Sequence, residues 1–208
     1  MDPETRKTAE GAPSVWTPAN IVTCVRIVFI PVFMVLAELS CVQAGVLYDP
    51  VLAPAACLLY ILLSLTDKLD GYLARSRNQI TDFGKFLDPI ADKLLVFSAL
   101  LILLEQEFVG VWVVFIILLR EFLVSALRMV AGAKGVVIAA DTLGKWKTAV
   151  TMIALCAYFI AIAIASAGAV YLAAYLLIAA HALIILAVVL TVVSGVQYFW
   201  NGRDVIFS

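Results

Sequence analysis

Four aspartates lie close together in a chain that is otherwise strongly apolar. The run that contains them reads Asp67, Asp70, Gly71, Ala74, Arg75, Gly84, Asp88 and Asp92. A carboxylate at membrane depth costs about 3 kcal/mol or more, so such residues mark ion or substrate sites by default. Four carboxylates that converge predict a pocket for divalent cations.

The spacing of this run is helical. At about 3.6 residues per turn, positions 67, 70, 71 and 74 share one face of a helix. Two small residues on that face, Gly71 and Ala74, allow a flat group to approach the backbone, and Arg75 offers a planar guanidinium to a phosphate. We expect a loop at 78–83 and a new helix that opens at Asp88 and Pro89. Asp88 and Asp92 would share a face of that helix.

These oxygen ligands favour hard cations such as Mg²⁺ or Mn²⁺ over Zn²⁺. Four carboxylates exceed what one Mg²⁺ normally takes from protein, so we expect two metal ions that share ligands, an arrangement suited to phosphoryl chemistry. The alternative is that the aspartates are helix caps and partners of nearby Lys and Arg side chains. The matched spacing of all four argues against it.

The rest of the chain predicts an all-α, polytopic membrane protein. Of its 208 residues, 64% are hydrophobic and 14% are charged, against roughly 25% in a soluble domain. Six apolar stretches approach or exceed the length that crosses a bilayer. They lie near 20–40, 52–75, 88–105, 110–131, 146–167 and 171–200. We divide the chain into a polar tail or interfacial helix at 1–18 and one six-helix domain at 19–208.

Positive charge is confined to one side of these spans. The fourteen Lys and Arg fall in the first residues, near 75–93, near 120–147, at the C-terminus, or inside spans close to those sides. The alternate connections at 41–50, 105–110 and 166–168 carry none. Because positive loops face the cytoplasm, both termini and the aspartate site are predicted to be cytoplasmic, in a multi-pass protein of the cell membrane. We expect no nucleic-acid partner.

The aspartate run resembles the signature of the CDP-alcohol phosphatidyltransferases, with every motif position matched. That resemblance implies a six-helix membrane enzyme, a homodimer, that moves a phosphatidyl group from CDP-diacylglycerol to an alcohol and releases CMP. It further implies that Asp67, Asp70, Asp88 and Asp92 bind two divalent metals and that Asp92 is the general base. Asp70, Gly71, Ala74 and Arg75 would then border the cytidine diphosphate.

Shorter motifs around Arg120, Arg128, Lys145 and Lys147 are similar to the branch of that family that uses sn-glycerol 3-phosphate. The residues agree, because an acceptor with its own phosphate needs cations beside the metals, and these four are the candidates. Alternative roles are positive-inside anchoring for Lys145 and Lys147 and an ion pair with a nearby acid for Arg120. Arg26 could contact either a lipid headgroup or an acid.

We therefore expect CDP-diacylglycerol and glycerol 3-phosphate to give phosphatidylglycerophosphate and CMP. The nearest alternative is the same chemistry with inositol phosphate, serine or phosphatidylglycerol as acceptor. An alternative from another class is a cation transporter. The transporter hypothesis explains neither the small residues beside the carboxylates nor the clustering of charge at one face.

Overall fold

The computed structural model describes residues 17–44, 47–76, 82–134 and 142–207, without the side chains of 19, 67–76, 82, 85, 133 and 201–207. The described part is helical apart from one short hairpin, which confirms the predicted class. Its helices are α2 (Pro18–Ser40), α3 (Leu52–Ser76), α4 (Asp82–Glu105), α5 (Val111–Ala133), α6 (Thr142–Ser166) and α7 (Val170–Phe207). The hairpin, which was not predicted, pairs β1 (Cys41–Gln43) with β2 (Leu47–Tyr48).

The helix boundaries follow local sequence signals, with one correction. Thr17 caps α2 by accepting a hydrogen bond from the Asn20 N–H at 3.3 Å, and Pro18 occupies the first turn. The expectation that a helix opens at Asp88 is wrong, because α4 begins at Asp82 and contains Pro89. Proline removes one backbone donor but has a helical φ, so the long helix continues through it. Residues 1–16 and most of the predicted loop at 78–83 lie outside the described residues.

The helices have the character of a membrane protein. Within the described residues, three helical stretches are long and apolar enough to cross a bilayer: Asn20–Ser40, Thr142–Ser166 and Val170–Trp200. Leu52–Thr66 is a shorter apolar helix. Many large apolar side chains, such as Val28 and Ile178, face outward, as expected of a surface in contact with lipid.

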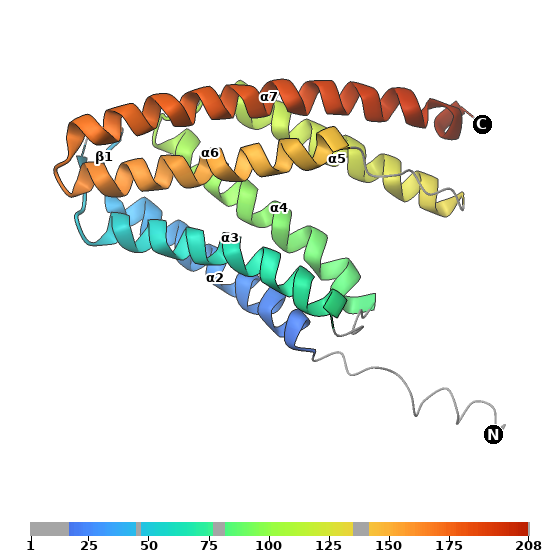
Figure 1. The fold of residues 1–208 in the computed structure, drawn as a ribbon, viewed down its shortest axis with the longest axis horizontal. Helices are drawn as coiled ribbons and strands as arrows, with labels where there is room; N and C mark the ends of the chain where they lie inside the picture. Colours follow the sequence, from blue (N-terminus) through green and yellow to red (C-terminus); the bar gives the residue numbers. More distant parts are fainter. Residues whose placement is uncertain (1–16, 45–46, 77–81, 135–141, 208) are drawn as a thin grey trace.

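Packing divides the helices into two groups that share a core. α2 packs against α3 and α4, α6 packs along α7, and α5 packs against α7 (Figure 1). Phe33 of α2, Tyr60 of α3 and Phe159 of α6 form an aromatic cluster with ring centroids 4.8–5.1 Å apart. Phe33 and Tyr60 are fully buried. This cluster joins α2 and α3 to the α6–α7 pair.

The helix ends that carry the candidate site lie at the same end of the molecule. The amino ends of α2, α4 and α6 and the carboxyl ends of α3, α5 and α7 lie at one end, and the hairpin lies at the other (Figure 1). At the hairpin end, the Gln106 amide Nε2 donates to the Ala37 carbonyl at 3.0 Å and ties α4 to α2. The fold therefore places the helix ends that carry the predicted site residues together, at the end opposite the hairpin.

Candidate active site

Asp88 and Asp92 lie one turn apart on α4, and side chains from α2 hold both. The Thr23 hydroxyl donates to Asp88 Oδ1 at 2.8 Å, and Arg26 Nη1 donates to Asp92 Oδ1 at 3.1 Å. Arg26 is 1% exposed, whereas the Asp92 side chain is 50% exposed. The two carboxylates are thus anchored on one side and open on the other, as ligands for an incoming cation must be.

Helix α2 contributes side chains to this site that were not predicted from the sequence. Asn20, Thr23 and Arg26 are buried and follow one another at three-residue spacing, so they form a polar stripe along an apolar helix. The structure decides between the two roles left open for Arg26, because it pairs with an acid. Burying a guanidinium is costly unless it is paired and hydrogen-bonded. The polar stripe in α2 was the signal that could have identified these residues.

The other half of the predicted metal site lies in the last turns of α3. The backbone of 67–76 is helical, so Asp67, Asp70, Gly71 and Ala74 share one face as predicted. Their side chains, and that of Arg75, lie outside the described part of the chain. Among the described residues no three His, Cys, Asp or Glu come together as a metal site. The four-aspartate set therefore stays a prediction.

The cations proposed for an acceptor phosphate fall into different environments. Arg120 and Lys147 come together through Glu121, which accepts from Arg120 Nη1 at 3.2 Å and from Lys147 Nζ. Lys145, two residues before Lys147 in the sequence, is exposed. Arg128 lies about two turns further along α5, where its Nε donates to the Tyr198 hydroxyl at 3.2 Å and its guanidinium lies over that ring. The structure unites two of the four predicted cations.

Glu121 follows Arg120 directly, so at about 3.6 residues per turn the two side chains leave α5 about 100° apart. Its side chain and the long Arg120 side chain nevertheless meet, and Glu121 also reaches Lys147 on α6. Lys93 of α4 joins the same region by donating to the Ser125 hydroxyl, although the sequence reading did not assign it to the acceptor site. The ion pair with a nearby acid, predicted as the alternative role of Arg120, is therefore present between Arg120 and Glu121. It belongs to a larger group of charges that includes Lys147 and Lys93.

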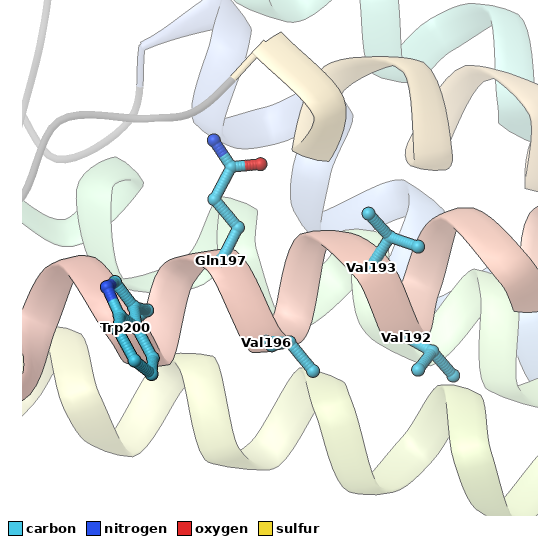
Figure 2. A pocket seen from close by; sticks show the side chains of 5 residues that line it. All are labelled: Val192, Val193, Val196, Gln197 and Trp200. Carbon is cyan, nitrogen blue, oxygen red and sulfur yellow. The ribbon is translucent and has the colours of Figure 1, made fainter.

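Two cavities lie along the second half of α7. One, of about 300 Å³, lies between α5 and α7, and its mainly apolar lining includes Arg120. The other, of about 490 Å³, is lined by Val192, Val193, Val196, Gln197 and Trp200. Figure 2 shows Val192 and Val196 on the side of α7 that faces α5, with Gln197 pointing away from α5. Asp88 and Asp92 line neither cavity.

Comparisons with known proteins agree with this chemistry. The family model described as CDP-alcohol phosphatidyltransferase matches residues 16–193. The CDP-diacylglycerol--glycerol-3-phosphate 3-phosphatidyltransferase of Bacillus subtilis (strain 168) is 44% identical over 142 residues, covering 66% of this chain and 74% of the relative. The Rickettsia bellii protein of the same name is 37% identical, covering 86% and 92%. A probable phosphatidylglycerophosphate synthase of Mycobacterium tuberculosis (H37Rv) is 35% identical, covering 98% and 90%.

Proposed function

Because the chain belongs to the CDP-alcohol phosphatidyltransferase family, we propose that it transfers the phosphatidyl group of CDP-diacylglycerol to sn-glycerol 3-phosphate and releases CMP. The observation that carries this proposal is the complete aspartate run on α3 and α4. The similarity to proteins named as glycerol-3-phosphate 3-phosphatidyltransferase or phosphatidylglycerophosphate synthase covers 86–98% of the chain. The alternative function, a cation transporter, is not supported, because the matching family consists of transferases.

Enzymes of this family generally depend on divalent metals, and the donors present suit them. Asp88 and Asp92 are hard oxygen donors on one face of α4, each already oriented through one oxygen by α2. We assign Asp67, Asp70, Asp88 and Asp92 as the residues that would hold two Mg²⁺ or Mn²⁺ ions. When bound, such ions neutralise the charge of the diphosphate and of the departing CMP.

Side chains of the protein would transfer the proton, orient the base and accommodate the nucleotide. Asp92 would take the proton from the C1 hydroxyl of glycerol 3-phosphate, whose oxygen attacks the phosphorus that carries diacylglycerol in line with the departing CMP. Arg26 would keep the Asp92 carboxylate in place for that transfer. Gly71 and Ala74 would leave room for the cytidine diphosphate beside Arg75. This arrangement lowers the barrier chiefly by positioning.

The acceptor phosphate would bind at Arg120 and Lys147. Both are mostly buried cations, and a phosphate is their natural counter-ion. Lys93, the residue after Asp92 on α4, contacts the same region through the Ser125 hydroxyl. Two further cations, the exposed Lys145 and Arg128, would add positive charge around this phosphate site. A neutral acceptor such as serine has no need of these cations.

We further propose that all six helices cross the membrane, with both termini and the active site on the cytoplasmic side. The confinement of basic residues to one set of loops supports this orientation. The homodimer that the family resemblance implies is part of the same proposal.

A CMP-release assay in detergent micelles with a panel of acceptors tests the proposed function. We expect release with glycerol 3-phosphate and little with glycerol, serine, inositol phosphate or phosphatidylglycerol. Efficient transfer to one of the other acceptors, with none to glycerol 3-phosphate, would contradict the assigned acceptor and leave the family assignment standing.

A further inference from the structure

Glu121 is a mostly buried acid whose two side-chain partners are cations from neighbouring positions in the fold. Its Oε1 atom accepts from Arg120 Nη1 at 3.2 Å and from Lys147 Nζ. The side chains of Glu121, Arg120 and Lys147 are 18%, 14% and 6% exposed. A single carboxylate oxygen therefore joins two cations across the contact between α5 and α6.

The charges around Glu121 do not balance. Lys93 of α4 donates to the Ser125 hydroxyl, and Ser125 in turn donates to the Glu121 backbone carbonyl at 2.7 Å. Among the described side chains, Arg120 and Lys147 thus share one carboxylate, and the half-buried Lys93 adds a third cation beside them. Excess buried charge is costly unless an anion completes the set. An anion would therefore balance the charge of this group of described side chains.

Arg120 retains a hydrogen-bond donor for such an anion. Its Nη2 atom donates to the Ser194 hydroxyl at 3.3 Å, and its buried Nε has no partner among the described residues. Gly195 gives the side chain room, because an added Cβ there would lie 3.2 Å from Arg120 Cγ. A Cβ at Gly144 would make only an ordinary contact, 3.5 Å from Arg120 Nη2. A phosphate oxygen is the acceptor that a spare guanidinium donor favours.

We propose that Glu121 is a positioning residue for the acceptor phosphate. Its carboxylate holds Arg120 and Lys147 side by side, relieves their mutual repulsion, and still leaves the excess of positive charge that a phosphate dianion requires. Lys93 follows Asp92 directly on α4, so this cluster adjoins the face that carries the proposed general base. The inference rests on the proposed function, since it takes the bound anion to be the phosphate of glycerol 3-phosphate.

The test uses the full-length enzyme in detergent with Glu121→Gln and Glu121→Asp. Loss of one charge-assisted contact predicts that Glu121→Gln raises the KM for glycerol 3-phosphate about tenfold or more. The KM for CDP-diacylglycerol and kcat should stay near their wild-type values. Because removal of a buried charge can prevent folding, Glu121→Asp keeps the charge and shortens its reach; we expect a smaller rise in the same KM.

The matched control is Glu105→Gln, which removes an exposed acid at the hairpin end of α4 and should change neither KM. A second readout is thermal stabilisation by inorganic phosphate, which we expect for the wild type and to a lesser degree for both Glu121 variants. An unchanged or lowered acceptor KM in folded Glu121 variants would overturn the inference and leave the proposed function intact. A wild-type protein that phosphate does not stabilise would also overturn it. Wild-type inactivity towards glycerol 3-phosphate would instead contradict the proposed function.

Discussion

The carboxylates of α4 are oriented by side chains from a different helix. Thr23 and Arg26 of α2 contact the Oδ1 atoms of Asp88 and Asp92, so the placement of these acids depends on how α2 packs. Mutation of groups that orient metal ligands typically costs about 10–100-fold in metal affinity or activity. The candidate metal site therefore depends on residues of α2 as well as on the aspartate run.

The ligand assignment predicts that Asp67→Asn, Asp70→Asn, Asp88→Asn and Asp92→Asn each abolish CMP release from a folded protein. For Asp92→Asn, loss of the general base alone accounts for about 10²–10⁴-fold. Chelation with EDTA should also remove activity, and Mg²⁺ or Mn²⁺ should restore it. Near-normal turnover in any one of these variants would remove that residue from the proposed metal site.

Thr23→Val tests the support that α2 gives to Asp88. The substitution is nearly isosteric and deletes the hydroxyl that donates to Asp88, so we expect a loss of roughly 10–100-fold in Mn²⁺ affinity or activity. Thr191→Val is the matched control, because the buried Thr191 hydroxyl donates only within its own helix, to the Ala187 carbonyl at 2.6 Å. If titration of activity with Mn²⁺ gave the same curve for both variants, the hydroxyl of Thr23 would have no special role.

At the scale of the elements, the contact between α5 and α7 sets the room for Arg120. Gly195 of α7 lies against the Arg120 side chain, and a Cβ there would approach its Cγ to 3.2 Å. Gly195→Ala should therefore displace Arg120 and raise the KM for glycerol 3-phosphate, with the KM for CDP-diacylglycerol unchanged. Steady-state kinetics with each substrate varied in turn measures this difference.

The control for Gly195→Ala is Gly132→Ala in α5. An added Cβ at Gly132 meets nothing within 4 Å, so this variant gains helix stability of about 0.4–1 kcal/mol. We expect a higher thermal midpoint in detergent and unchanged kinetics. Equal acceptor KM values in the two alanine variants would show that Arg120 adapts without loss.

For the molecule as a whole, the positions of the cysteines allow a test of orientation. Cys41 lies in β1 at the hairpin end, whereas Cys24, Cys57 and Cys156 lie within helices. In the proposed orientation, a membrane-impermeant maleimide should label Cys41 in intact spheroplasts, and Cys41→Ser should remove that labelling. Labelling of Cys41 only after permeabilisation would reverse the proposed orientation.

The same experiment has a defined pH dependence. Partial burial raises the pKa of the Cys41 thiol above its ordinary value. Since the thiolate is the reactive form, a raised pKa leaves less of it at neutral pH. Labelling should be slow near pH 7 and should accelerate as the pH rises through and beyond the ordinary thiol range of about 8.5.

The sequence by itself determined the helical class, the approximate limits of the helices and the sharing of one face by Asp88 and Asp92. These features depend on local hydrophobic periodicity and on spacing along one helix. The start of α4 was misplaced because Pro89 resembles a first-turn proline, although a long helix tolerates the loss of one backbone hydrogen bond.

Only the tertiary structure decided which side chains from different helices meet. Arg26 with Asp92 and Glu121 with Lys147 are contacts between helices, separated by 66 and 26 residues along the chain. No local pattern fixes such pairs, because they depend on the order and rotation in which the helices pack. The sequence therefore identified the chemistry through residue types, and the packing of α2, α5 and α6 determined how the charges of Asp92, Arg120 and Lys147 are held.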